Sequence, residues 1–186
     1  MASVNGHYFT HPIIYTNLAP LLVKYDELCT LVKELKPSFV RLSETWLTPL
    51  VTDPPISLDG YAIFRKGRHN NKDGGVCVYI SDHICGNFAV IPNTADTGNI
   101  DSIFLKIANK SLTFLLGCIY RPPTSVIEDE LSRTLCISEM TDVYQHLFIF
   151  RDFNMPDIKW PLNASQLLFD LLSNSHLTQL VTQPTR

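Results

Sequence analysis

The chain has 186 residues, of which 45% are hydrophobic and 18% are charged, and its formal net charge is -3. This composition is typical of a packed globular protein and excludes a disordered or fibrous chain. The acidic balance argues against a protein that binds nucleic acid through a basic surface alone, since such proteins carry a surplus of lysine and arginine. It is compatible with an enzyme in which a metal ion supplies the positive charge.

The five cysteines are an odd number, and no two of them are spaced as C-x-x-C. Most lie within apolar runs, so the sequence predicts buried, reduced thiols and an intracellular protein. No apolar stretch approaches the ~18 residues that a membrane-spanning helix needs. The N-terminus lacks the basic start and apolar core of a signal peptide. We therefore expect no membrane association and no secretion.

The first elements have the pattern of a strand–helix–strand unit. Ile13–Asn17 is a β-branched run that predicts a strand. From Pro20 to Leu35, apolar residues recur every three or four positions, which predicts a helix with proline at its start. Ser38–Ser43 predicts a second strand. Such a crossover predicts that the two strands are parallel.

The middle of the chain predicts short strands without long helices between them. Tyr61–Arg65 and Val76–Ile80 flank a polar, glycine-rich segment and predict one hairpin. Ile100–Ile107 and Ser111–Tyr120 flank an Asn-Lys turn and predict a second. The tripeptide Ser-Asp-His at 81–83 is interpreted as loop at a strand end.

The last part of the chain predicts a helix from Val126 to about His146, a buried strand over Leu147–Phe150 and a short helix over Gln166–Ser173. About eight strands and three helices in mixed order predict an α/β sandwich, with two mixed sheets face to face and helices on the outer faces. We expect a frayed segment over residues 1–12 and one domain over residues 13–186.

Polar side chains follow several of the apolar strands at the point where each strand ends. They are Asn17, Glu44, Tyr120, Arg121, Asp152 and Asn154. Proteins with α/β folds place functional groups at such ends. Each residue alone also has a purely structural explanation: Asn17 as a helix cap, Asp152 in an Asx turn, Glu44 as a solvated charge and Tyr120 as an aromatic at a sheet edge.

Taken together, these side chains suit metal-assisted hydrolysis of a phosphodiester. Carboxylates such as Glu44 and Asp152 are the ligands that Mg²⁺ prefers. Asparagine amides can bond a phosphate oxygen without adding charge, and a tyrosine hydroxyl can donate to phosphate oxygens where negative charge develops. The sequence therefore predicts that the set converges on one pocket at one edge of the sandwich.

The order of motifs resembles the endonuclease/exonuclease/phosphatase superfamily, and most of all the endonuclease domain of non-LTR (LINE-type, jockey-like) retrotransposons. The resemblance rests on IIYTN, LSETWL, GYAIFRKGR with GGVCVYI, GCIYRPP, RDFNMPDIKWP and LTQLVTQPTR, which run from about residue 13 to residue 186. It implies a four-layer α/β sandwich and a nuclease that nicks DNA with Mg²⁺ or Mn²⁺. A reverse transcriptase encoded downstream and a nuclear location, in an active element, are also implied; a silent chain would be cytoplasmic.

The resemblance assigns a role to each candidate residue. Glu44 matches the main metal ligand and Asn17 the asparagine of the first strand. Tyr120 matches a tyrosine that contacts phosphate, with Arg121 beside it. The aspartate and asparagine that activate and orient the attacking water match Asp152 and Asn154, and Thr185 matches a threonine near the phosphate.

Two departures from the family pattern lead us to expect impaired activity. Arg151 stands where the family has glycine and would put a cation beside the metal site. The family also continues past PTR with an aspartate-bearing strand and a closing Ser-Asp-His, which the printed sequence lacks, so we expect a truncated, incomplete sandwich. One alternative is a silent relic or a fragment that binds nucleic acid or protein. Another is a phosphatase or phospholipid hydrolase of the same superfamily.

Overall fold

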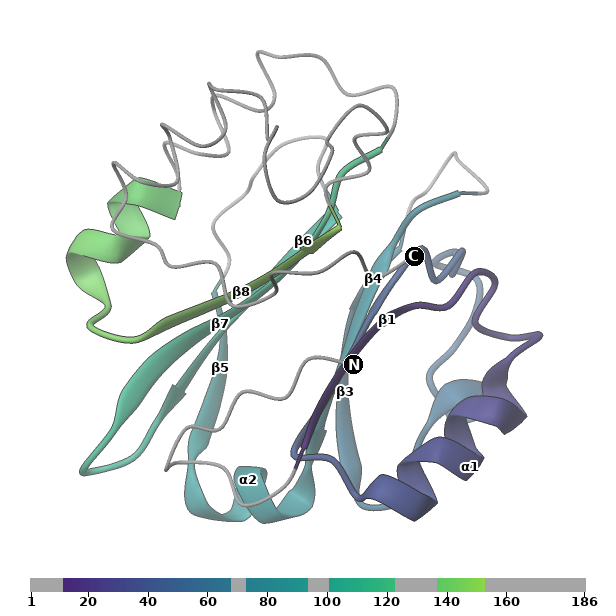
Figure 1. Ribbon diagram of the computed structural model, residues 1–186, viewed down its shortest axis with the longest axis horizontal. Coiled ribbons are helices and arrows are strands. Elements are labelled where there is room, and N and C mark those ends of the chain that lie inside the picture. Colours follow the sequence, from purple (N-terminus) through teal and green to yellow (C-terminus); the bar gives the residue numbers. More distant parts are fainter. Residues whose placement is uncertain (1–11, 68–72, 94–100, 123–136, 153–186) are drawn as a thin grey trace, which may run out of the picture.

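The computed structural model describes residues 12–67, 73–93, 101–122 and 137–152, which form two four-stranded sheets (Figure 1). Sheet I has the order β1-β2-β4-β3 and consists of β1 (Ile13–Asn17), β2 (Phe39–Ser43), β4 (Val76–Ser81) and β3 (Tyr61–Lys66). Sheet II has the order β5-β6-β7-β8 and consists of β5 (Ala89–Asn93), β6 (Asp101–Ala108), β7 (Thr113–Tyr120) and β8 (Leu147–Asp152).

Each sheet contains one parallel pair and two antiparallel pairs. In sheet I, β1 is parallel to β2, while β4 is antiparallel to both β2 and β3. In sheet II, β7 and β8 are parallel, while β6 is antiparallel to both β5 and β7. The parallel opening unit and both hairpins that the sequence predicts are confirmed.

The two faces of sheet I are packed differently because successive side chains on a strand point to opposite sides. On β4, Val76, Val78 and Ile80 belong to the core between the sheets. Cys77 and Tyr79 belong to a second core under helix α1 (Tyr25–Leu35). With both faces covered, β4 is an almost continuous apolar run rather than an alternating one.

Helices cover the outer faces and complete four layers (Figure 1). Helix α1 packs Leu28 and Val32 on the outer face of sheet I. Residues 137–143 are helical, and Ile137 and Met140 pack on Phe104 of the outer face of sheet II. The predicted α/β sandwich is confirmed. None of the helices found in the described ranges is both long and apolar enough to cross a membrane.

Several element boundaries differ from the sequence prediction. Helix α1 begins at Tyr25 rather than Pro20, because the preceding residues form tighter turns: the Val23 N–H donates to the Pro20 carbonyl at 3.2 Å and the Lys24 N–H to the Leu21 carbonyl at 3.1 Å. The predicted loop at 81–83 is wrong, since Asp82 and His83 are exposed in the first turn of α2 (Asp82–Asn87).

Strand β5 and the short 3₁₀ helix η1 (Pro54–Ile56) were not expected from the sequence. Strand β5 is short and has a proline, both weak strand signals, and it forms by pairing with β6 at the sheet edge. The helix expected from Val126 is described only from residue 137 and ends at 143. The helix expected over Gln166–Ser173 lies outside the described residues.

Candidate functional site

Two predicted site residues from different sheets meet at one end of the sandwich. Asn17 is the last residue of β1 and Asp152 the last of β8. The Asn17 Nδ2 amide donates to Asp152 Oδ2 at 3.2 Å, across 135 positions of sequence. The bond links the parallel edge of sheet I to the parallel edge of sheet II, so the amide holds the carboxylate in one orientation.

A row of three polar residues crosses sheet II at this same end. Tyr120 lies directly opposite Asp152 on β8 and opposite Asp101 on β6. Residues opposite each other in neighbouring strands present their side chains on one face, and Tyr120 belongs to the core between the sheets. The row Asp101–Tyr120–Asp152 therefore faces sheet I.

Asp101 has a place at this end that the sequence reasoning missed. It is 4% exposed, and its Oδ2 accepts a hydrogen bond at 2.8 Å from the N–H of Gly75, which directly precedes β4 of sheet I. The two sheets are therefore joined at this end by two aspartates of sheet II, Asp152 through Asn17 and Asp101 through Gly75. The sequence shows only that an acidic residue, Asp101, begins an apolar strand. That pattern alone does not distinguish a buried site residue from a solvated residue at a strand end.

Glu44 directly follows β2, one residue beyond the pair formed by Asn17 and Ser43. It is half-buried, and its backbone is left-handed with φ +54°. Trp46 has the same φ value. Such a backbone costs a non-glycine residue ~1–3 kcal/mol and is concentrated at functional sites.

Hydrogen bonds to the carbonyls of Gly74 and Gly75 hold this strained loop. The Thr45 N–H donates to the Gly75 carbonyl at 3.3 Å and the Trp46 N–H to the Gly74 carbonyl at 2.9 Å. Gly75 itself has φ +84°, and a Cβ there would lie 2.8 Å from Thr45 Oγ1. Glycine is required at this position, because its backbone is left-handed and the Thr45 side chain fills the adjacent space.

Arg41 lies behind the site on the inner face of β2, and it is fully buried. Its guanidinium carbon is 2.8 Å from the ring centroid of Phe150, and within the described part of the chain none of its side-chain nitrogens has a hydrogen-bond partner. Burial lowers the Arg41 pKa to about 9. Burial also raises the pKa of the nearby Cys118 thiol to about 12, so this thiol is no counter-ion at neutral pH.

Arg121 and Arg151 are the two arginines that the sequence places next to the candidate site residues Tyr120 and Asp152. The Arg121 N–H donates to the Asp152 carbonyl at 3.1 Å, so Arg121 begins directly beside the row. Arg151 is paired with Ile119, whose side chain packs in the outer core. Because neighbours on a strand point to opposite faces, Arg151 faces away from Asp152. The expectation that Arg151 puts a cation beside the metal site is wrong.

The positions of Asn154 and Thr185 lie outside the described residues. Within those residues, no group of three His, Cys, Asp or Glu side chains is arranged to hold a metal ion. The oxygen donors at this end nevertheless suit a hard cation. Mg²⁺ is commonly bound through only one or two carboxylates together with substrate phosphates and water. Glu44 could supply such a carboxylate, with the Asn17 amide oxygen as a second donor.

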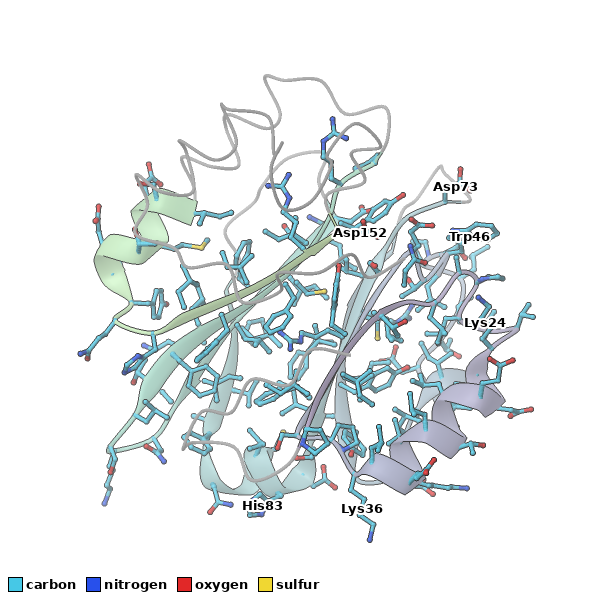
Figure 2. All side chains as sticks on the ribbon, in the orientation of Figure 1. Lys24, Lys36, Trp46, Asp73, His83 and Asp152 are labelled. Carbon is cyan, nitrogen blue, oxygen red and sulfur yellow. The ribbon has the colours of Figure 1, made fainter. Side chains whose placement is uncertain are left out.

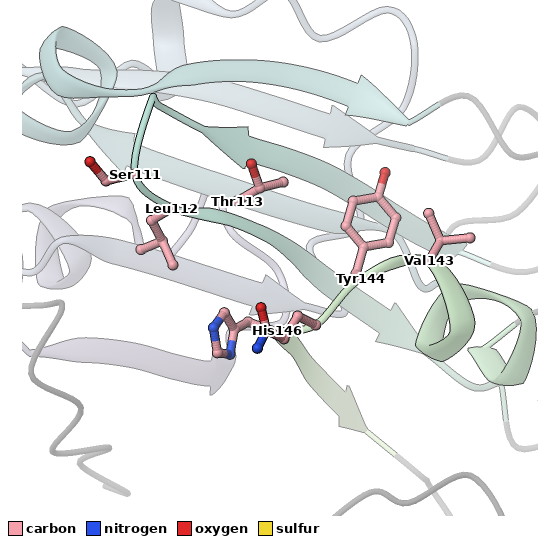
Figure 3. A pocket seen from close by; sticks show the side chains of 7 residues that line it. Ser111, Leu112, Thr113, Val143, Tyr144 and His146 are labelled. Atoms are coloured by element: carbon pink, nitrogen blue, oxygen red, sulfur yellow. The ribbon is translucent and has the colours of Figure 1, made fainter.

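A shallow cavity of about 290 Å³ lies elsewhere (Figure 3). It is lined by Ser111–Thr113 at the start of β7 and by residues 143–146 before β8. The row Asp101–Tyr120–Asp152 lies at the other end of β7 and β8. The cavity contains none of the predicted site residues and is separate from the site.

Comparison with known proteins identifies the fold. No family model and no curated sequence matches the chain. Among solved structures, the endonuclease domain of TRAS1, a telomere-specific non-LTR retrotransposon, matches with a TM-score of 0.65 and 16% identity over 88% of this chain and 69% of that domain. The chain has the endonuclease/exonuclease/phosphatase fold.

Two further structures with this fold extend the comparison. The human Nocturnin catalytic domain with bound sulfate has a TM-score of 0.60 and 14% identity, over 88% of this chain and 69% of that one. The 3′ phosphatase NExo from Neisseria, bound to a product DNA hairpin, has a TM-score of 0.52 and 13% identity, over 77% and 57%. At these identities the likeness establishes the fold, and the chemistry must be argued from the residues of this chain.

Proposed function

We propose that this chain is a divalent-metal-dependent phosphodiesterase that nicks DNA, of the kind found in non-LTR retrotransposons. The observation that carries the proposal is the Asn17–Asp152 hydrogen bond at 3.2 Å. It joins an amide and a carboxylate from opposite sheets at the end where the Glu44 loop and the row containing Tyr120 also lie.

The likeness to the TRAS1 endonuclease domain and to a phosphatase bound to DNA supports a nucleic-acid substrate. The ETWL and YRPP motifs support the retrotransposon type over a phosphatase or phospholipid hydrolase. This role implies that the chain reaches chromosomal DNA in the nucleus and acts beside a reverse transcriptase.

In the proposed mechanism, Glu44 and Asn17 would hold Mg²⁺ or Mn²⁺, and the ion would neutralise charge on the phosphate oxygens. Asp152 takes a proton from the attacking water as the new P–O bond forms. One ester P–O bond breaks, and the leaving oxygen takes a proton from solvent. Asn17 keeps the Asp152 carboxylate oriented for this transfer through the bond to Oδ2.

The remaining residues have supporting roles in this proposal. The Tyr120 hydroxyl donates to a non-bridging oxygen of the phosphate, where charge grows during attack. Arg121, which starts beside the backbone of Asp152, contacts a neighbouring phosphate of the substrate. Asn154 orients the water and Thr185 contacts the phosphate.

The test is nicking of supercoiled plasmid by the full chain with Mg²⁺, with Mn²⁺ and with EDTA. Asp152→Asn keeps the side-chain shape but removes the base, so we expect the nicking rate to fall by ~10²–10⁴-fold. Asp142→Asn, at an exposed position of the 137–143 helix, is the matched control and should leave the rate unchanged. The expectation that the chain is slow stays a prediction, which the same assay measures.

Nicking that persists in EDTA, or that Asp152→Asn does not slow, would contradict the proposal. A chain that releases phosphate from a 3′-phosphorylated oligonucleotide but leaves plasmid intact would favour the phosphatase alternative. A chain that hydrolyses an inositol phosphate instead would favour the lipid-directed one.

A further inference from the structure

Four large apolar side chains are exposed in the two loops that follow β1 and β2. We call them the apolar rim: Leu22 (49% exposed), Val23 (77%), Trp46 (41%) and Leu50 (91%). In the described ranges, the only other exposed large apolar side chain is Val143, in the 137–143 helix. The Leu21 N–H donates to the Thr45 carbonyl at 3.1 Å, which joins the two loops.

The rim borders the candidate site because its loops begin at the site residues. Asn17 ends the strand before the first loop, and Glu44 begins the second. Figure 2 shows Trp46 and Asp152 toward the same end of the sandwich and His83 at the other end. Exposed apolar side chains beside a polar site are a common feature of binding surfaces.

Trp46 is the least exposed member of this rim and the one with a left-handed backbone. Its backbone has φ +54°, and its N–H is fixed by the Gly74 carbonyl at 2.9 Å. Thr45 and Leu47 on either side are buried. The strained backbone therefore keeps the indole at the surface while its two neighbours are anchored in the interior.

We propose that Trp46 is a stacking platform for a nucleobase of the substrate, an inference that rests on the proposed function. Its Cα lies two residues from that of Glu44, within about 7 Å by chain geometry. A DNA strand bound beside the Glu44 loop would bring the sugar and base of a nucleotide near this exposed ring. An indole ring is a platform on which any of the four bases can stack.

The charge of the chain favours stacking over electrostatic attraction as the source of affinity. With a net charge of -3, the surface offers DNA phosphates little general attraction. Base–aromatic stacking does not depend on net charge and tolerates any sequence. It therefore suits a site whose own chemistry recognises only the phosphate.

Tryptophan fluorescence tests the proposal directly. The chain has two tryptophans, Trp46 and Trp160, so Trp160→Phe leaves Trp46 as the single reporter. The full chain is titrated in EDTA with a 12-nucleotide oligothymidylate and with an abasic oligonucleotide of equal length. We expect quenching by the base-containing strand only, because the abasic strand keeps the phosphates and lacks the rings that stack.

Affinity measurements on the chain with Trp160 intact give a second readout. Trp46→Leu keeps an apolar side chain but removes the ring, so we expect binding of oligothymidylate to weaken about ten-fold, within the range that stacking contributes. Trp46→Phe should restore most of the affinity, and Val143→Ala, at the exposed apolar position outside the rim, should not change it.

Equal quenching by both oligonucleotides, or equal affinity of Trp46→Leu and the parent chain, would overturn the stacking proposal. Because these measurements need no metal and no hydrolysis, their failure is separate from a failure of the nicking assay. Base-dependent quenching in a chain that does not nick would support the nucleobase site and count against the proposed function alone.

Discussion

The two sheets have the same strand pairing but carry their polar residues differently. Each consists of one parallel pair at an edge followed by two antiparallel pairs. Sheet I places Arg41 and Ser43, both buried, on its inner face. The inner face of sheet II that packs against them is apolar and includes Phe150 and Cys118. The acidic residues of sheet II, Asp101 and Asp152, lie together at one end.

The difference shows how a two-sheet core can hold a site at one end. At that end, Asp152 and Asp101 of sheet II are bonded to sheet I by Asn17 and by the Gly75 backbone. Deeper between the sheets, the Arg41 guanidinium rests on the Phe150 ring. Sheet II therefore supplies the fixed carboxylates, and sheet I supplies the strained loop that begins at Glu44.

The largest expected effect comes from Gly75, just before β4, because its carbonyl accepts a bond from Thr45 in the Glu44 loop and its N–H donates to Asp101. Gly75→Ala forces a left-handed residue against Thr45 Oγ1, so we expect a loss of about 2–4 kcal/mol in free energy of unfolding. Gly117→Ala in sheet II should cost less, because its backbone is not left-handed and the atoms nearest to an added Cβ belong to the side chains of Phe104 and Ile149, which can shift. Urea denaturation compares the two; an equal loss would contradict the special role of Gly75.

Removing the buried cation of sheet I should stabilise the chain. Arg41→Met fills a similar volume without a charge to desolvate, and we expect a gain of about 1–4 kcal/mol, reduced by the lost contact with Phe150. Lys106→Met, at a half-buried position of sheet II, is the control. Thermal melting at pH 7 would refute the argument if Arg41→Met melted at a lower temperature than the parent chain.

The increase in the free energy of unfolding caused by Arg41→Met should become smaller as the pH rises above about 9. The Arg41 pKa is lowered by burial from 12.5 to about 9 in the folded chain. Between these values the unfolded chain holds a proton that the folded chain has released, so raising the pH stabilises the parent chain relative to the variant. Melting both proteins from pH 7 to pH 10.5 measures the difference, and a constant gap would show that Arg41 stays protonated when folded.

Loss of the Asp101 carboxylate should have a smaller effect. Asp101→Ala leaves the Gly75 N–H without this acceptor, and we expect a loss of about 1–3 kcal/mol in free energy of unfolding. Asp101→Asn keeps a carbonyl oxygen for the same bond and should lose less. If the two variants unfold at the same urea concentration, the hydrogen bond to Gly75 does not hold the sheets together.

The smallest effect on stability is expected at the other link between the sheets. Asn17→Ala removes a partly exposed hydrogen bond to Asp152 and should cost about 1 kcal/mol. Thr16→Ala, on the neighbouring residue, removes only a local bond at 3.3 Å and is the control. In the nicking assay Asn17→Ala should slow the reaction much more than Thr16→Ala, so a parallel change in both would contradict a positioning role.

Every described strand except β5, the parallel opening pair and both hairpins followed from the sequence because their signals were local. Apolar runs such as Val76–Ile80 and turns such as Asn109-Lys110 depend on residues that are neighbours in the chain. The polar residues at strand ends could be selected for the same reason. Strand β5 and helix α2 were missed because their short segments carry weak local signals and are stabilised by contacts with β6 and β4.

Only the tertiary structure decided which of those polar residues meet. The Asn17–Asp152 and Asp101–Gly75 bonds join positions 135 and 26 residues apart, and they depend on how two sheets are set face to face. The register of β8 with β7 places Arg151 opposite Ile119, on the outer face of sheet II. The sequence had led us to expect this arginine beside the metal site. The sequence by itself determined the local elements and the kinds of side chain at their ends. The pairing between sheets, which sums many distant contacts, determined the geometry of the site.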